Sequence, residues 1–198
     1  MTPELESDLG LLRDAVAAAG ALALEHFHAR GRHWYKGPGQ VVTEADVAVD
    51  RLLQGHLIGA RPDDGWLSEE SADDGSRQSR ARVWVVDPID GTRAFADGVP
   101  EFAISVALVA HGEPVLGSVL NPATGECFEA WRGGGAWLNG QRLLASDRQV
   151  LAGARLVSAR TEMRKRNWHE LLPEAELTTI GSLAYKLALV AAGRFDGL

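Results

Sequence analysis

A run of apolar residues ends abruptly in two aspartates, in the segment V-W-V-V-D-P-I-D-G-T that runs from Val83 to Thr92. Four β-branched or aromatic residues in a row predict a buried strand. Pro88 restricts the backbone after Asp87, and Gly91 permits a sharp turn, so we expect the strand to end here. The chain must therefore fold so that this strand end brings both aspartates to the rim of a sheet.

Two carboxylates this close together, Asp87 and Asp90, repel each other, and a shared cation is the usual way to offset that cost. The backbone carbonyl of Ile89 can supply a third oxygen. Glu69, in the upstream segment S-E-E-S (68–71), is a further candidate ligand, although spacing alone does not place it beside Asp87. Oxygen ligands favour a hard cation, Mg²⁺ with Mn²⁺ or Ca²⁺ as substitutes, and the six histidines show no zinc-binding pattern.

The segment after Asp90 offers a second kind of contact. The backbone N–H groups of Gly91 and Thr92 lie at a predicted turn or helix start, where they suit a phosphate oxygen. A metal beside a phosphate implies phosphoryl chemistry. The alternative is that D-P-I-D-G is an ordinary turn whose aspartates bond only to nearby backbone groups. The residues alone leave both interpretations open.

The rest of the chain predicts an α+β fold. Apolar residues at helical spacing predict a long amphipathic helix over 4–30. Thr43 can cap a second helix that runs to about Ile58, with Asp46 completing a T-x-x-D capping pattern. From Val83 onward we expect a meander of mostly antiparallel strands, with a hairpin turn at Asn139 and Gly140.

After residue 141 the pattern changes again. It predicts a strand, a helix over 161–172, a short strand and a strong helix from Ser182. We therefore expect an N-terminal α+β metal-binding domain over 1–145 and the start of a C-terminal α/β domain over 146–198, with sheets and helices in layers.

Composition disfavours several classes of partner. The formal net charge of −7 argues against a nucleic-acid polymer or an anionic membrane, because both select Lys- and Arg-rich surfaces. No stretch approaches the roughly 20 apolar residues of a membrane span, and the opening M-T-P-E-L-E-S-D-L-G lacks the basic and apolar regions of a signal peptide. The single cysteine, Cys127, cannot form an internal disulfide. We expect a cytoplasmic protein.

Several motifs together resemble the inositol monophosphatase-like family of lithium-sensitive, magnesium-dependent phosphatases. Three of them are V-V-T-E-A-D (41–46), S-E-E-S (68–71) and W-V-V-D-P-I-D-G-T (84–92), and G-G-G-A-W-L-N-G and G-S-L-A-Y-K-L-A-L-V-A-A-G follow further on. The resemblance implies a layered α/β/α/β/α sandwich of the sugar-phosphatase type. The family's C-terminal W-D-x-A-A-G motif is missing before the chain stops at Leu198, so we expect a truncated chain with a weakened second metal position.

The resemblance also implies roles for individual residues. The metal ligands would be Glu69, Asp87, the carbonyl of Ile89 and Asp90. Asp46 and Thr92 would position and deprotonate the attacking water. The substrate would be bordered by Asp90, Gly91, Thr92, Ser182 and Lys186.

For three residues the sequence leaves a structural alternative. Asp46 has an alternative role as a helix cap only, and Lys186 as a side chain that snorkels from an apolar helix. Lys36, beside a Gly-Pro loop, would approach the metal site or remain an ordinary surface lysine.

The chemistry implied by the resemblance is an in-line displacement by water, without a covalent intermediate. Two or three Mg²⁺ ions would activate the water and stabilise the leaving oxygen, Mn²⁺ would substitute for Mg²⁺, and Li⁺ and Ca²⁺ would inhibit. The partner would be a small phosphorylated metabolite, and the resemblance suggests a homodimer.

The metal core does not identify the substrate. By resemblance, the stretch after the signature, R-A-F-A-D-G-V-P-E-F with Glu101, and the lysine of G-S-L-A-Y-K favour the 3'(2'),5'-bisphosphate nucleotidase branch. Inositol-1-monophosphatase or a broad-specificity sugar phosphatase is the alternative. An alternative of another class is a non-catalytic protein that binds a phosphorylated metabolite.

Overall fold

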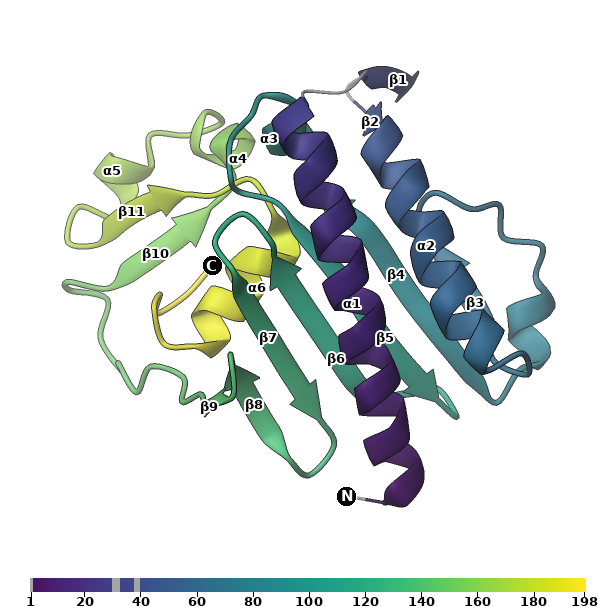
Figure 1. Ribbon diagram of the computed structural model, residues 1–198. Coiled ribbons are helices and arrows are strands. Elements are labelled where there is room, and N and C mark those ends of the chain that lie inside the picture. Colours follow the sequence, from purple (N-terminus) through teal and green to yellow (C-terminus); the bar gives the residue numbers. More distant parts are fainter. Residues whose placement is uncertain (1, 30–32, 38–39) are drawn as a thin grey trace.

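Two long helices cover one face of a seven-stranded sheet in the computed structural model, which describes residues 2–29, 33–37 and 40–198 (Figure 1). The helices are α1 (Pro3–Ala29) and α2 (Glu44–Ala60). The strands, in their order across the sheet, are β3 (Gly65–Ser68), β4 (Arg82–Asp90), β5 (Ala103–Ala110), β6 (Glu113–Asn121), β7 (Glu126–Trp131), β8 (Gly135–Leu138) and β9 (Gln141–Arg142). β3 pairs with β4 in parallel, and all other neighbours in this sheet are antiparallel, as the predicted meander requires.

The main core lies between the two helices and this sheet. Leu12 of α1 and Leu53 of α2 are fully buried against strand residues such as Trp84 and Ile104. Complete burial of one such side chain contributes roughly 1.5–3 kcal/mol. The apolar stripes of the two helices therefore set their positions, and α2 carries Thr43 at its start and Asp46 in its first turn.

A third helix, α6 (Leu183–Ala191), covers the opposite face of the sheet. Its Tyr185 and Leu189 pack against Ala103 and Phe128 in a second apolar cluster. A separate two-stranded parallel sheet lies in sequence between the seven-stranded sheet and α6. Its strands are β10 (Arg155–Ser158) and β11 (Glu176–Thr179). The layered mixture of helices and sheets confirms the predicted fold class. The predicted boundary near residue 145 falls between the two sheets and stays a prediction.

The structure differs from the sequence prediction in two segments. The expected helix over 161–172 is two short helices, α4 (Arg160–Met163) and α5 (Trp168–Leu171), neither of which buries a residue. Without an apolar stripe to pack, a continuous helix here gains too little from tertiary contacts. A hairpin of β1 (His33–Gly37) and β2 (Gln40–Thr43) precedes α2 and was not predicted.

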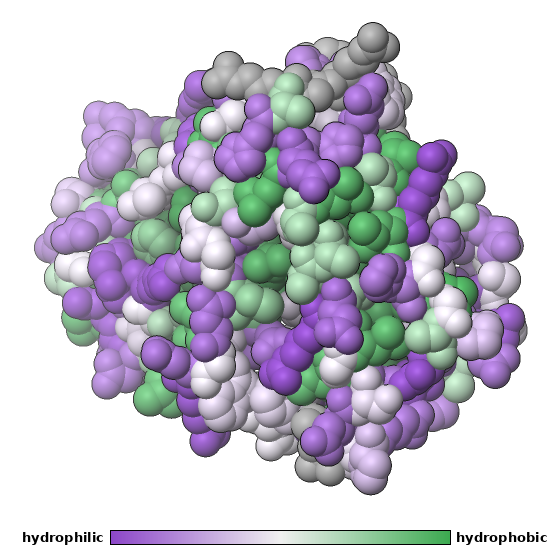
Figure 2. Space-filling model, viewed as in Figure 1, coloured by the Kyte–Doolittle hydropathy of each residue, from purple (hydrophilic) through white to green (hydrophobic). Residues whose placement is uncertain are grey.

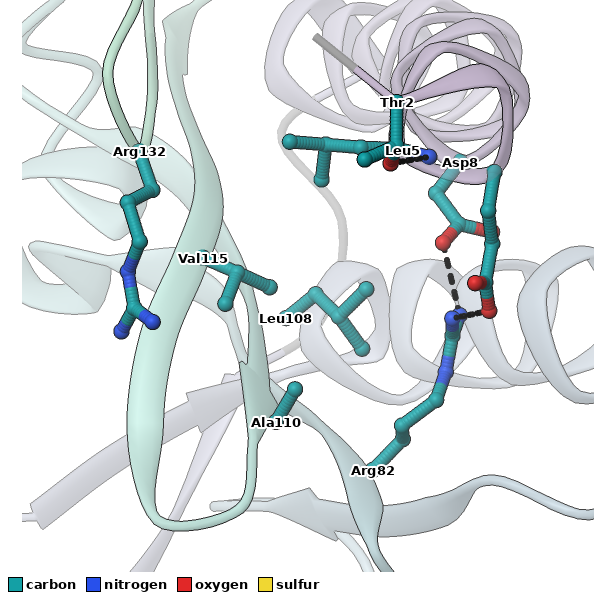
Figure 3. Close-up of a pocket in the computed structure, with 9 residues that line it drawn as sticks. Thr2, Leu5, Asp8, Arg82, Leu108, Ala110, Val115 and Arg132 are labelled. Atoms are coloured by element: carbon teal, nitrogen blue, oxygen red, sulfur yellow. Dashed lines mark hydrogen bonds and ion pairs between the residues drawn. The ribbon is translucent and has the colours of Figure 1, made fainter.

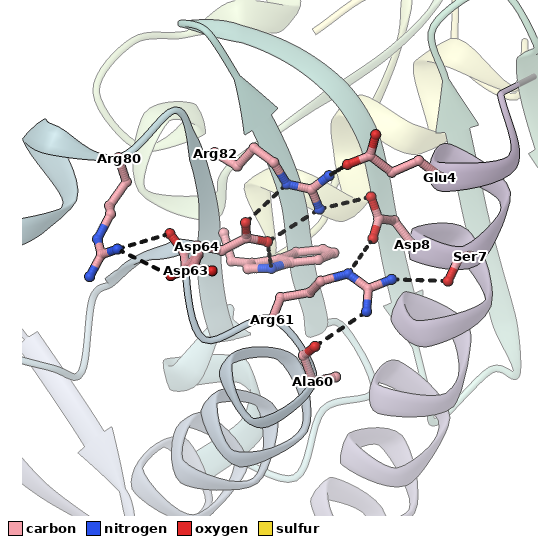
Figure 4. Close-up of polar contacts among 10 residues, drawn as sticks. Glu4, Ser7, Asp8, Ala60, Arg61, Asp63, Asp64, Arg80 and Arg82 are labelled. Carbon is pink, nitrogen blue, oxygen red and sulfur yellow. Dashed lines mark hydrogen bonds and ion pairs between the residues drawn. The ribbon is translucent and has the colours of Figure 1, made fainter.

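A network of paired charges fixes the helices to the amino end of β4 (Figure 4). The Arg82 guanidinium donates to Asp8 of α1 at 2.8 Å and to Asp64 at 2.9 Å, and Arg61 donates to the other oxygen of Asp8. The indole N–H of Trp84 also donates to Asp64. Because both aspartates are buried, their charges require these partners. The network therefore compensates the charges of the two buried aspartates and connects the helices to the sheet.

A cavity of about 510 Å³ lies beside this network. Leu5, Leu108 and Val115 line it, and Arg82 and Arg132 lie on opposite sides of it (Figure 3). It adjoins the start of β4, whereas Asp87 and Asp90 lie at the other end of that strand, so it is separate from the predicted site.

The surface over α1 and α2 mixes hydrophilic and apolar residues (Figure 2). Among the described residues, no helix combines the length and the apolar character that crossing a bilayer requires.

Candidate metal centre and active site

The parallel pairing of β3 with β4 brings Glu69 and Asp87 to the same edge of the sheet. Ser68, the last residue of β3, is paired with Val86 of β4, so Glu69 and Asp87 each follow directly after a paired residue. Neighbouring strands lie about 4.8 Å apart. The sequence spacing did not show whether Glu69 lies near Asp87, and the register of β3 against β4 places the two residues side by side.

A bulge in β4 brings Asp90 to the same region. Asp87 is paired with Ser105 of β5 and Asp90 with Ala103, so three residue steps on β4 face two on β5. A bulge inserts one extra residue, which bends the strand and redirects side chains. Both aspartates of D-P-I-D thus lie at the end of β4, where the sequence predicted them.

The acidic side chains interact strongly. Loss of solvation and the negative charges of Asp90, Glu69 and Asp46 together raise the pKa of Asp87 to about 8, and the loss of solvation is the largest cause. Asp87 therefore lies within electrostatic reach of all three acids that the sequence proposed for the site. This result disfavours the alternative in which D-P-I-D-G is only a turn, because a turn needs no cluster of like charges around a partly buried aspartate.

The donor atoms suit a hard cation, because every candidate ligand is an oxygen. Across the described part of the chain, however, no group of three or more His, Cys, Asp or Glu side chains is already arranged to hold a metal ion. This is expected because like charges repel one another and move apart when no cation lies between them. One ligand is also held in place: the Oδ2 atom of Asp90 accepts hydrogen bonds from the Ser182 hydroxyl and the Ala184 N–H, both at 2.5 Å.

Asp90 therefore joins the metal site to the start of α6. Ser182 is the N-cap of that helix, and its hydroxyl accepts from the N–H of Tyr185 while donating to Asp90. This contact uses Oδ2 and leaves Oδ1 for a cation. The prediction that Ser182 borders the site agrees with its contact to Asp90.

Gly91 is the position where a side chain would not fit. Its φ of 94° is in the left-handed region, and a Cβ atom there would lie 2.8 Å from the carbonyl oxygen of Glu101. The chain turns here directly into α3 (Thr92–Ala96), whose first-turn N–H groups have no acceptor within the helix. The phosphate contact at Gly91 and Thr92 stays a prediction.

Thr92 connects the backbone of the metal site to Asp46. Its hydroxyl oxygen lies 2.9 Å from the carbonyl oxygen of Ile89 and 3.2 Å from Oδ1 of Asp46. The hydroxyl has one proton, so it donates to only one of these acceptors at a time. A cation on the Ile89 carbonyl would leave Asp46 as the acceptor.

Asp46 caps the helix through one carboxylate oxygen and contacts Thr92 through the other, and its catalytic role stays a prediction. Its Oδ2 accepts from the N–H of Thr43 at 2.8 Å and from the Thr43 hydroxyl at 2.5 Å, which completes the predicted capping box. Its Oδ1 faces Thr92. Burial raises the pKa of Asp46, so this carboxylate is a stronger base than an exposed one.

Lys186 is a buried residue of α6, with 4% of its surface exposed. Burial lowers the pKa of its ammonium group, and the charges of Asp90 and Glu101 act in the opposite direction. The predicted substrate-bordering lysine is therefore close enough to Asp90 to interact with it and does not snorkel to the surface. The side chain of Lys36 lies outside the described part of the structure.

Asp50 is a residue of the site that the sequence analysis missed. It lies one turn after Asp46 on α2 and is 5% exposed. Its two carboxylate oxygens accept hydrogen bonds from the hydroxyls of Ser68 and Ser71, the two serines that enclose Glu69 and Glu70. The signal was available, since D-x-x-x-D spacing places both acids on one helix face.

We expect Asp50→Ala to raise the Mg²⁺ concentration needed for half-maximal activity by about tenfold or more, because the loop that carries Glu69 loses its two hydrogen bonds to Asp50. The measurement is an activity titration with Mg²⁺. Asp8→Asn is the matched control, because it alters a buried, paired aspartate at the other end of β4. Equal Mg²⁺ requirements in the two variants would show that Asp50 acts only on stability.

The helices on both faces of a mixed sheet, with converging acids at the end of β4, define a layered α/β protein of the sugar-phosphatase type. A sequence model of the Inositol monophosphatase family matches residues 4–198, and the chain belongs to this family.

Individual relatives agree with this assignment. An inositol-1-monophosphatase of Rhizobium meliloti (strain 1021) is 42% identical over 170 residues, which are 82% of this chain and 64% of the relative. A histidinol-phosphatase of Chlorobaculum parvum (strain DSM 263 / NCIMB 8327) is 38% identical over 147 residues, 74% of this chain and 54% of the relative. The chain thus spans less than two thirds of the length of these curated relatives.

A solved structure confirms the fold. The extragenic suppressor protein suhB from Bartonella henselae matches with a TM-score of 0.85 at 31% identity, covering 96% of this chain and 76% of that one.

Proposed function

We propose that this chain hydrolyses phosphate monoesters of small metabolites, with Mg²⁺ as cofactor and water as nucleophile. The observation that carries the proposal is the effect of three acidic neighbours, Glu69, Asp90 and Asp46, on the partly buried carboxylate of Asp87. Such a cluster is unfavourable for stability, and a divalent cation that accepts oxygen ligands explains its presence.

Different residues of the chain would bind the cation, orient the phosphate and accept the proton. Glu69, Asp87, Asp90 and the Ile89 carbonyl would hold the cation, and the N–H groups at Gly91 and Thr92 would orient the phosphate. Bound Mg²⁺ would lower the pKa of a nearby water and offset the charge that develops on the phosphate. The Thr92 hydroxyl, donating to Asp46, would accept a hydrogen bond from that water, and Asp46 would be the final proton acceptor.

The substrate is proposed on two observations that point to different esters. The lysine at 186 adds a buried positive charge beside Asp90, which favours a substrate with more negative charge, such as a 3'(2'),5'-bisphosphate nucleotide. The 42% identity to a protein named inositol-1-monophosphatase favours inositol 1-phosphate. We propose the bisphosphate first and inositol 1-phosphate second.

A panel of phosphate esters assayed with Mg²⁺ tests this proposal. We expect phosphate release that EDTA abolishes and that is fastest with 3'-phosphoadenosine 5'-phosphate. A strong preference for inositol 1-phosphate would overturn the choice of substrate. Calorimetry that detects ligand binding at saturating Mg²⁺ without any phosphate release would instead support a non-catalytic binding protein.

Several finer features belong to the same proposal. We propose two or three Mg²⁺ ions, replacement by Mn²⁺, inhibition by Li⁺ and Ca²⁺, a homodimer, and a cytoplasmic location. Family membership supports the proposals on metal ions and on the homodimer, and the sequence supports the proposed location.

A further inference from the structure

The segment after β10 is strongly basic in an otherwise acidic chain. Residues 160–169, R-T-E-M-R-K-R-N-W-H, contain four of the chain's 20 Lys and Arg residues and one Glu, while the chain as a whole has a net charge of −7. This segment forms α4, the turn after it and the first half of α5, whose second half adds Glu170 and Leu171. Positive charge is therefore concentrated at one place on the molecule.

The basic residues enclose a cavity of about 310 Å³, which we call the basic cavity. Its lining includes Arg164, Arg166, His169, Trp168 and Thr179, and no acidic side chain among the described residues belongs to it. The indole N–H of Trp168 donates to the carbonyl oxygen of Glu162, which fixes the ring at the cavity wall. The cavity thus combines cationic groups with one rigid flat surface.

Two of the arginines are available to a ligand. Among the ion pairs of the described residues, Arg160 pairs with Glu101 and Lys165 pairs with Glu162, but none involves Arg164 or Arg166. A guanidinium presents two parallel N–H donors that match a phosphate or carboxylate.

The basic cavity adjoins the metal site. Thr179 lines the cavity and ends β11, where it is paired with Ser158 at the end of β10. Two residues later, the N–H of Gly181 donates to Glu101, and the hydroxyl of Ser182 donates to Asp90. The carboxyl ends of parallel strands meet at one edge of a sheet, where ligands of α/β proteins bind.

A bidentate ion pair holds this arrangement together. Arg160, at the start of α4, donates to both carboxylate oxygens of Glu101 at 2.6 and 2.7 Å. Glu101 follows α3, and Figure 1 shows α3 and α4 close together at the upper end of the molecule. The cavity and the metal site are thus fixed on the two sides of the Thr179–Ser182 stretch.

We propose that the basic cavity binds a second anionic group, a phosphate or a carboxylate, of the same substrate whose ester phosphate lies at the metal site. This inference rests on the proposed function and adds the location of the second group. The cavity has room for such a group, whereas a nucleic-acid polymer requires an extended basic surface that a chain of net charge −7 does not favour.

The kinetic test compares two substrates in one variant. In Arg164→Ala/Arg166→Ala, we expect the ratio of KM for 3'-phosphoadenosine 5'-phosphate to KM for inositol 1-phosphate to rise about tenfold or more. Arg164→Lys/Arg166→Lys, which retains the charge, should recover part of the ratio. The matched control is Arg51→Ala, an exposed arginine on α2. An unchanged ratio in the alanine variant would overturn the proposal.

A binding test separates this proposal from the proposed function. EDTA removes the metal from the candidate active site, so the difference in inorganic phosphate binding between the wild type and the alanine variant, measured by calorimetry, reports the basic cavity. We expect binding to the wild type that the alanine variant loses, even if no ester is hydrolysed. Equal phosphate binding by both proteins would overturn the proposal. If the alanine variant loses binding to an RNA oligonucleotide while its KM ratio is unchanged, the basic cavity binds a nucleic-acid backbone and not the substrate, and the proposal is wrong.

Discussion

Replacing Asp87 with asparagine should reduce phosphate release by about a thousandfold while making the metal-free protein more stable near pH 8. The loss of activity follows because a ligand of the cation disappears, and stabilisation of transition-state charge by a metal is worth several kcal/mol. The gain in stability follows because the variant removes a negative charge from a cluster that raises the pKa of Asp87 to about 8.

The pH dependence of metal-free stability gives the sign of this effect. An unfolded aspartate has a pKa of about 3.9, so between about pH 4 and pH 8 the folded protein holds a proton on Asp87 that the unfolded chain has released. The free energy of unfolding should therefore fall as pH rises through this window, by up to about 1.4 kcal/mol per pH unit, and level off above it. Asp87→Asn should flatten the curve.

Urea unfolding in EDTA at several pH values measures this curve. Asp63→Asn is the control, because it makes the same chemical change at a fully exposed aspartate. If the stability of Asp87→Asn falls with pH as steeply as that of the wild type, the acids around Asp87 do not repel one another as proposed.

Asp46→Asn should lower kcat by about a hundredfold or more and change the free energy of unfolding by less than about 1 kcal/mol. The asparagine can still accept a hydrogen bond from Thr43, so most of the helix cap survives. It cannot accept a proton from the attacking water through Thr92, and general-base catalysis typically contributes a hundredfold or more. Steady-state kinetics and urea unfolding of the same preparation measure both quantities.

Thr43→Ala is the matched control for the cap. It removes the hydroxyl that accepts from the N–H of Asp46, so it should cost about 1 kcal/mol of stability and affect kcat less than Asp46→Asn does. If Asp46→Asn loses stability and keeps its kcat, Asp46 is a helix cap and nothing more.

The sequence predicted most of the fold because its signals are local. Hydrophobic periodicity predicted the helices α1, α2 and α6. The Asn139-Gly140 pair predicted the hairpin turn between β8 and β9, and its φ angles of 49° and 79° suit such a turn. The segment over 161–172 was predicted as one helix from the spacing of its few apolar residues. The sequence does not show that none of the residues in the two short helices there is buried.

The sequence suggested most residues of the candidate site but not how they are arranged in space. D-P-I-D-G-T identified Asp87 and Asp90 from adjacent positions, whereas the approach of Glu69 depends on the register of β3 against β4, which no local pattern specifies. Asp50 was missed because its partners, Ser68 and Ser71, lie about twenty residues away. Long-range hydrogen bonds of this kind become visible only when the chain is folded.

A crystal soaked with Mn²⁺ tests the central claim most directly. We predict an anomalous peak about 2.1 Å from a carboxylate oxygen of Asp87, with Glu69 and Asp90 turned toward the same ion. The absence of a peak beside Asp87 at saturating Mn²⁺, or an ion bound elsewhere while Asp90 contacts only Ser182 and Ala184, would contradict it.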